Sequence, residues 1–129
     1  MLARKSARPR RQNSRRADEI KRCPPFLQWL RGRPCLLADK RGHECRGKVR
    51  ACHVDYAGDK GVSTKVSDCH AVPMCDGAHA EQTDRLGWGP FEAKWGIEAL
   101  ASAADLWRYW LDGTVMGAKW RRDREGERA

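Results

Sequence analysis

Residues 51–84 read ACHVDYAGDKGVSTKVSDCHAVPMCDGAHAEQTD, and this stretch decides the fold. It contains three of the four histidines and three of the six cysteines of the chain. An alternating apolar run ends in His53, a polar loop with glycines follows, and a second apolar run leads through Cys75 to His79. This order predicts a strand, a loop, a second strand and a helix that share a metal ion.

The residues around this stretch predict the remaining elements. Alternation over residues 49–56 and the apolar run 71–74 predict two strands, and Asp76 is a candidate N-cap for a helix that continues to about residue 85. A short helix is expected between Pro24 and Gly32. Residues 87–90 read GWGP and predict a break in the chain. The strongest helical periodicity runs over residues 91–111, with an interruption at Gly96, and the charged segment 119–129 is expected to be a frayed tail.

Length and composition predict one small domain, and the predicted strands and helices place it in the α+β class. The chain has 129 residues, of which 33% are charged. The apolar core is therefore small and needs further stabilisation by cross-links. Metal ions and disulfides are the two candidates. We expect a disordered basic arm over residues 1–22, a folded domain over 23–118 and the charged tail over 119–129.

Positive charge is concentrated at the N-terminus. The chain carries a net charge of +9, and residues 1–22 hold nine Lys and Arg side chains against two acidic ones. Such an arm suits the phosphate backbone of a nucleic acid. Two alternatives are a solubilising tail and a transit peptide.

The sequence has no run of about 18 apolar residues and no signal-peptide core, so we expect a soluble protein of the cytoplasm that does not bind membranes. Cysteines in that compartment are more often metal ligands or buried thiols than disulfides.

Cys35, Cys45 and Cys75 are candidate ligands of a structural zinc ion, which prefers four thiolate or imidazole ligands. No C-x2-C pair is present, and the fourth ligand is open between His43, Asp76 and water. The alternative is that the cysteines are small buried apolar side chains.

The histidines suggest hydrolysis. His53 at the end of a strand could act as a general base for water, because imidazole titrates near neutral pH. His79 on the following helix could bind a divalent cation that polarises a phosphate. Each histidine taken alone is more often an ordinary surface or core residue.

The pattern C-L-L-A, ACHV, G-V-S-T-K-V-S-D, AVPMC, H-A-E-Q and GWGPFEAKWGIEAL, over about residues 26–111, resembles the small HNH endonucleases of phages and prophages. The resemblance implies a ββα-metal fold in which a hairpin and a helix clasp one divalent cation, with a zinc ion holding the flanking loops. It implies that His53 is the general base, that His70 stands near the family's middle Asn, which orients the base, and that His79 ligates the catalytic cation. Cys35, Cys45 and Cys75 match the zinc cysteines.

The chain departs from that family at three positions. Ala78 and Thr83 stand where relatives commonly carry histidines, and Cys52 stands where many carry Asp or His. The residues that could substitute as ligands are Cys52, Asp68, Asp76, Glu81 and Asp84. The departures leave two functions open, a DNA endonuclease and a non-catalytic, zinc-stabilised module that binds nucleic acid.

The expected cofactors are a structural Zn²⁺ and a catalytic Mg²⁺, Mn²⁺ or Ni²⁺, and the expected partner is DNA. A weaker third possibility is a phage accessory protein that binds a host protein through its Trp-rich helix. The candidate phosphate contacts are Lys60, Lys65, Arg10, Arg11, Arg15 and Arg16.

Overall fold

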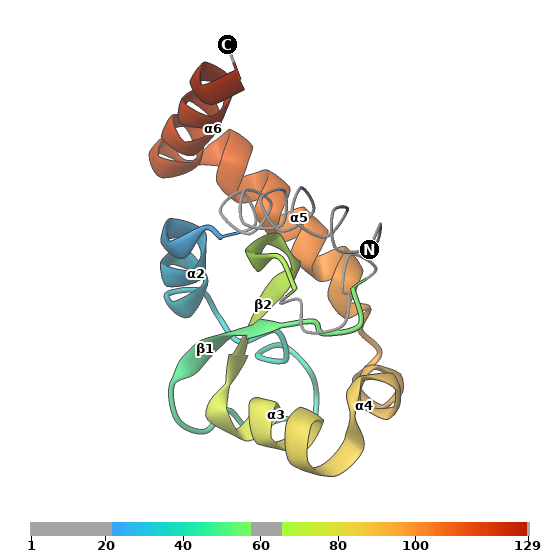
Figure 1. Cartoon of the computed structure of the whole chain (residues 1–129). Helices are drawn as coiled ribbons and strands as arrows, with labels where there is room; N and C mark the ends of the chain where they lie inside the picture. Colours follow the sequence, from blue (N-terminus) through green and yellow to red (C-terminus); the bar gives the residue numbers. More distant parts are fainter. Residues whose placement is uncertain (1–21, 58–65, 129) are drawn as a thin grey trace, which may run out of the picture.

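A computed structural model describes residues 22–57 and 66–128 of the chain (Figure 1). In chain order its elements are α2 (Pro24–Arg31), β1 (Val49–His53), the 3-10 turn η1 (Asp68–His70), β2 (Ala71–Cys75), α3 (Asp76–Ala80), the π-helical turn η2 (Glu81–Leu86), α4 (Trp88–Trp95), α5 (Ala99–Gly113) and α6 (Val115–Arg128). The predicted α+β class is confirmed. The candidate phosphate contacts Arg10, Arg11, Arg15, Arg16, Lys60 and Lys65 lie outside the described residues, as does the predicted arm up to residue 21.

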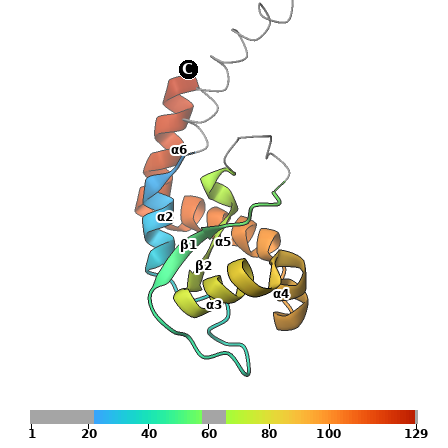
Figure 2. The same cartoon turned by 60° about the horizontal axis from the view of Figure 1, so that its bottom comes forward.

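The two strands form an antiparallel hairpin in the middle of the molecule (Figures 1 and 2). The register pairs His53 with Ala71 and Val49 with Cys75. The end of β1 therefore lies beside the start of β2. The alternating pattern predicted a strand as far as residue 56, but β1 ends at His53, because the chain turns and the Ala57 N–H bonds the Val54 carbonyl at 3.1 Å.

Helix α3 follows β2 without a loop. Cys75 is its N-cap, and the Cys75 Sγ accepts a hydrogen bond from the Ala78 N–H at 3.4 Å. The prediction that Asp76 is the N-cap is therefore wrong. The Asp76 carboxylate instead accepts the Lys48 N–H at 3.0 Å and pairs with the Arg50 guanidinium, which ties the start of α3 to the start of β1.

Glycines in left-handed conformations separate the later helices. Gly87 (φ 77°) ends η2, and Gly96 (φ 65°) ends α4. The break predicted at residues 87–90 is confined to Gly87, because Pro90 lies in the first turn of α4, where its missing N–H has no intrahelical partner to lose. The Glu92 carboxylate then accepts the Ala99 N–H at 2.7 Å and caps α5.

The charged segment expected to be frayed belongs to α6, which extends to residue 128. Lys119 pairs with Asp123 one turn later at 2.9 Å, and Arg121 pairs with Asp112 of α5 at 2.5 Å. Trp120 of α6 also packs against a buried apolar cluster. These contacts explain why a strongly charged segment is helical.

Two apolar clusters hold the described residues together. The hairpin core joins the strands to α3, α4 and the start of α5, and includes Leu37, Val54, Val72, Met74 and Phe91. The aromatic cluster joins α2 to α5 and α6, and includes Phe26, Leu30, Trp107, Trp110 and Trp120. No helix within the described ranges has the length and apolar character needed to cross a membrane.

Candidate metal centre and adjoining cleft

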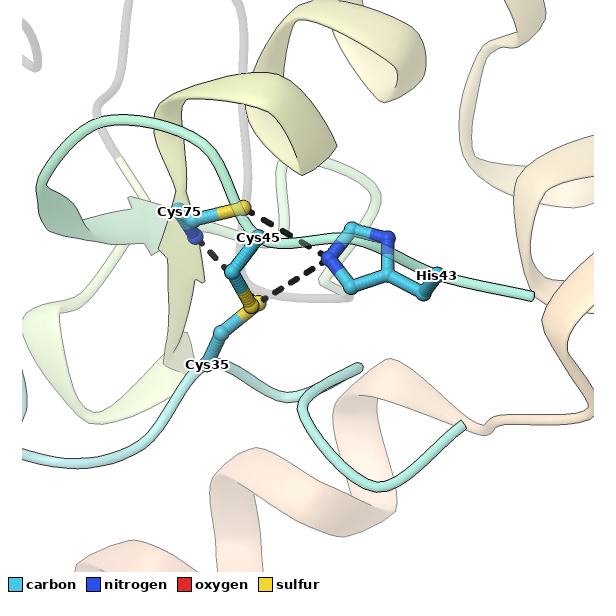
Figure 3. Close-up of side chains that lie close together, drawn as sticks. All are labelled: Cys35, His43, Cys45 and Cys75. Atoms are coloured by element: carbon cyan, nitrogen blue, oxygen red, sulfur yellow. Dashed lines mark hydrogen bonds between the residues drawn. The ribbon is translucent and has the colours of Figure 1, made fainter. Parts of the chain in front are cut away.

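Three cysteines and one histidine meet at the junction of β2, α3 and the loop that precedes β1 (Figure 3). The ligand atoms of Cys35, His43, Cys45 and Cys75 all lie within 4.8 Å of one another. His43 Nε2 lies 4.0 Å from Cys35 Sγ and 3.6 Å from Cys75 Sγ. The three predicted cysteines thus come together, and His43 is the fourth member of the set.

These spacings fit a tetrahedral zinc ion. Zinc–sulfur bonds of about 2.3 Å and zinc–nitrogen bonds of about 2.0 Å place neighbouring ligand atoms roughly 3.5–3.8 Å apart. The distances from His43 Nε2 to the sulfur atoms of Cys35 and Cys75 are close to this range. The cluster could therefore bind a metal such as zinc, and Asp76, which pairs with Arg50, does not belong to it.

Backbone N–H groups point at two of the sulfur atoms. Cys35 Sγ accepts hydrogen bonds from Leu37 N–H at 3.4 Å and from Cys75 N–H at 3.3 Å, and Cys75 Sγ accepts the Ala78 N–H. Such donors stabilise thiolates and orient ligands around a metal. A cysteine that served only as a small apolar side chain would not need them.

The thiols of the cluster have opposite pKa shifts. Burial alone would raise the pKa of Cys75, but N–H donors from Ala78 and Arg46, with His43 and Cys35, lower it to about 7. Burial and the neighbouring thiols of Cys35 and Cys75 raise the pKa of Cys45 to about 12. One thiolate in the group thus opposes the ionisation of the next, which is the repulsion that a bound cation would relieve.

A cleft of about 780 Å³ lies on another side of α3. It is lined by the end of β1, by α3 and η2, and by the start of α4. Both histidines assigned to catalysis and cation binding, His53 and His79, line it, as do the unassigned carboxylates Asp55 and Glu92. The register places the start of β1, not its end, beside the N-cap of α3, and contacts between α3 and β1 bring His53 and His79, 26 positions apart, to one cleft.

His53 is oriented by a carboxylate. Its Nε2 lies 2.8 Å from Asp68 Oδ1, and the Asp68 side chain is 13% exposed. Asp68 Oδ2 also accepts the Cys23 N–H at 2.6 Å. Burial alone would raise the pKa of Asp68, but the bonds from His53 and Cys23 lower it below its usual value. With Nε2–H donated to Asp68, a neutral ring keeps its lone pair on Nδ1.

The other residues considered as substitute ligands have separate roles. Cys52 lines the cleft beside His53, whereas Glu81 binds Lys94 at 2.5 Å and the Trp95 Nε1–H at 2.7 Å outside it. Asp84 is exposed and is not one of the residues that line the cleft. Cys35, His43, Cys45 and Cys75 are together called the Cys35 cluster. Among the described residues, this cluster is the one group of three or more His, Cys, Asp and Glu side chains close enough to share an ion.

His70 lies in η1, is half-buried and is not among the residues that line the cleft. Its carbonyl accepts the Val54 N–H at 2.8 Å, which closes the end of the hairpin. The side chain that bonds His53 is Asp68, two residues earlier. Sequence reasoning named Asp68 as a substitute ligand but not as the partner of His53, and only the register across β1 and β2 reveals that contact.

Tyr56 closes one wall of the cleft. Its hydroxyl donates to the Glu92 carboxylate, with oxygen–oxygen distances of 2.8 and 3.0 Å. Partial burial and the Glu92 carboxylate raise the pKa of Tyr56 to about 12. Because Glu92 also caps α5, the turn after β1 is connected through one carboxylate to α4 and α5.

Comparison of the chain with protein-family models gives no match. Comparisons with curated proteins and with solved structures give none either.

Proposed function

We propose that this protein is a metal-dependent endonuclease of HNH type that hydrolyses phosphodiester bonds of DNA. The observation that carries the proposal is the pairing of His53 with Asp68 in a cleft that also contains His79. Three features support the ββα-metal interpretation. They are the order β1, β2, α3, the Cys35 cluster where β2 meets α3, and the resemblance of residues 26–111 to HNH proteins. The phage origin rests on that resemblance alone.

In this mechanism His53 accepts a proton from water. Asp68 holds Nε2–H, so the neutral ring offers Nδ1 as the base and the carboxylate stabilises the imidazolium that forms. His79 is the residue that would hold the catalytic cation, with Asp55 and Glu92 as the carboxylates of the same cleft. Such a cation supplies Lewis-acid stabilisation of the leaving oxygen when it is bound.

The Cys35 cluster serves a structural role in this proposal. It ties the loop before β1 to the end of β2 and the first turn of α3, the helix that carries His79. Zinc held by three thiolates and an imidazole has no open coordination position, as is usual for structural sites. A second cation at His79 is therefore separate in role and in exchange rate.

A nicking assay tests the proposal. Supercoiled plasmid is incubated with the full chain and Mg²⁺, Mn²⁺ or Ni²⁺, and His53→Ala is expected to lower the nicking rate by about 10²-fold or more. Asp68→Asn keeps an acceptor for Cys23 but cannot hold His53 in the same tautomer, so a smaller decrease of about tenfold or more is expected. Wild type that does not cut with any of the three cations contradicts the proposal.

His70→Ala is the matched histidine variant. If Asp68 orients the base, His70→Ala retains more activity than Asp68→Asn. If Asp68→Asn instead retains more activity than His70→Ala, then His70 orients the base, as the family resemblance implies. Zinc content and the thermal melting curve of every variant exclude unfolding as the cause.

A second candidate is a zinc-stabilised module that binds nucleic acid without cutting it. It is favoured because the described residues near His79 provide no group of three metal ligands. Thr83, which stands where relatives carry a histidine, lines the same cleft. Salt-dependent DNA binding without nicking under any of the three cations supports this candidate over the endonuclease.

A further inference from the structure

A second hollow, of about 750 Å³, lies beside the metal centre. Its walls are the loop that contains His43, the helical segment from α3 to η2, and the end of α4. In Figures 1 and 2 the loop between α2 and β1 runs beside α3, and the Gly77 N–H bonds the Arg46 carbonyl there at 3.1 Å.

The helical segment from α3 to η2 lies between the two hollows, and its opposite faces line one hollow each. Gly77, Glu81 and Arg85, four residues apart, face the second hollow, while His79 and Thr83 face the cleft. Because a helix with its side chains is about 10–12 Å across, a group held in the second hollow lies about one helix diameter from the cleft. It is therefore not the group that reacts at His53.

The second hollow is rich in positive charge. Five cationic side chains line it against two carboxylates, those of Glu44 and Glu81; the cations are Lys40, Arg41, Arg46, Arg85 and Lys94. Lys94 is paired with Glu81 at 2.5 Å. The other four cations form no ion pair with another described residue. A zinc ion with three thiolates would add a net charge of only about −1, so the surface stays positive.

The Trp95 ring, which lines the hollow, is already engaged. The Trp95 Nε1–H donates to Glu81, Lys94 lies 4.9 Å from the Trp95 ring centroid, and His43 meets the ring edge-on at 5.4 Å. Little apolar surface is thus free to anchor a peptide side chain or to stack a base. Guanidinium groups without carboxylate partners suit phosphate oxygens.

We propose that this basic hollow (Lys40, Arg41, Arg46 and Arg85) binds the sugar-phosphate backbone of DNA next to the site of attack. The inference rests on the proposed function for its choice of DNA. It requires only that the protein bind DNA, not that it cut DNA. Contacts of this kind are independent of sequence, because they reach phosphates and not base edges.

A matched pair of charge variants tests the inference. Arg41→Gln/Arg46→Gln/Arg85→Gln removes three cations from the hollow. Arg31→Gln/Arg108→Gln/Arg122→Gln removes three exposed cations from α2, α5 and α6. Both variants keep residues 1–22, so the contribution of the Arg-rich arm is the same in each.

Binding of a fluorescent DNA duplex is measured by anisotropy over a range of salt concentrations, in the His53→Ala background without added divalent cation. If the three arginines each contact a phosphate, the slope of log K against log[salt] decreases in magnitude by about 2–3 for the hollow variant. The control variant is expected to change it by much less. Equal changes in the two variants, or no binding by the parent protein, would overturn the inference.

Arg46 follows Cys45, so zinc content is measured for each protein. Arg41→Gln/Arg85→Gln, which leaves that neighbour of the metal centre unchanged, is expected to lose about two units of slope. Competition by a polyglutamate peptide that exceeds competition by duplex of equal charge would assign the hollow to an acidic protein and overturn the DNA assignment. Loss of slope in a protein that never nicks plasmid would uphold the inference and refute only the nuclease.

Discussion

The two ends of the molecule are stabilised in different ways. At the metal end, residues 32–48 form no helix or strand, and the Cys35 cluster ties this loop to β2 and α3. At the other end, the aromatic cluster joins three helices by ring contacts, among them Phe26 with Trp107 at 5.0 Å between centroids and Phe26 with Trp110 at 5.6 Å. Where the chain lacks regular structure, a Cys/His cluster that could bind a metal joins it to the hairpin, and where it has helices, apolar packing holds it.

The largest effect is expected from losing the metal. Cys75→Ser removes a ligand that also caps α3. Structural zinc supplies about 10–16 kcal/mol in zinc-finger peptides, so the metal end should unfold. We expect bound zinc to fall from one per chain to none, measured by elemental analysis, with loss of the cooperative thermal transition.

Cys69→Ser is the matched control, because Cys69 is a half-buried cysteine outside the cluster. It should retain one zinc ion per chain. A Cys75→Ser protein that kept its zinc and melted like wild type would show that metal binding by Cys75 does not stabilise this end of the molecule.

Truncation in the aromatic cluster should be the next largest effect. Phe26 is fully buried, so Phe26→Ala is expected to lower the free energy of unfolding by about 3–5 kcal/mol. Urea denaturation measures the loss. Tyr109→Ala, at a ring that is 56% exposed, should cost about 1 kcal/mol or less. Both variants should keep one zinc ion per chain. Release of zinc by Phe26→Ala would mean that the two ends of the molecule are not stabilised independently.

A pair of glycines tests the loop at the metal end. Gly42 and Gly47 both have positive φ, of 87° and 77°, so alanine at either position costs about 1–2 kcal/mol. At Gly47 the new Cβ would also lie 2.6 Å from the Asp76 Cβ, whereas at Gly42 it would meet nothing within 4 Å. Rotation of the Asp76 carboxylate cannot relieve that contact.

Gly47→Ala should therefore destabilise more than Gly42→Ala, by about 1 kcal/mol or more. It should also weaken zinc binding, measured by competition with a chromophoric chelator. Equal behaviour of the two variants would show that the link between Asp76 and β1 does not support the metal end.

The smallest expected effect concerns pH and the contact between Tyr56 and Glu92 in the cleft. Because the pKa of Tyr56 is raised to about 12 in the folded protein, its contact with Glu92 contributes fully below about pH 10. The contribution is lost as the pH rises from about 10 through 12, when the phenol ionises. The difference in stability between wild type and Tyr56→Phe should shrink to zero over that interval, and Glu92→Gln should lower the pKa of Tyr56, measured by phenolate absorbance. A constant difference between wild type and Tyr56→Phe up to pH 12 would contradict this contact.

Much of the local structure was predictable because it follows from neighbours in sequence. Alternation predicted β1, the apolar run 71–74 predicted β2, and Gly96 predicted an interruption where α4 ends in a left-handed conformation. The helical extent of residues 119–128 was missed, because its support comes from contacts with α5 and the aromatic cluster that no local pattern displays.

The candidate site also has a part that could be predicted from the sequence and a part that could not. From the sequence alone, three cysteines could be named as candidate zinc ligands, and His53 and His79 as candidate catalytic residues. Only the tertiary structure decided that His43 completes the cysteine cluster, that Asp68 bonds His53, and that Arg46 and Arg85 share one hollow. The physical reason is that ligand choice and hydrogen-bond partners depend on distances across the hairpin register and between helix faces, and a linear pattern does not contain those distances.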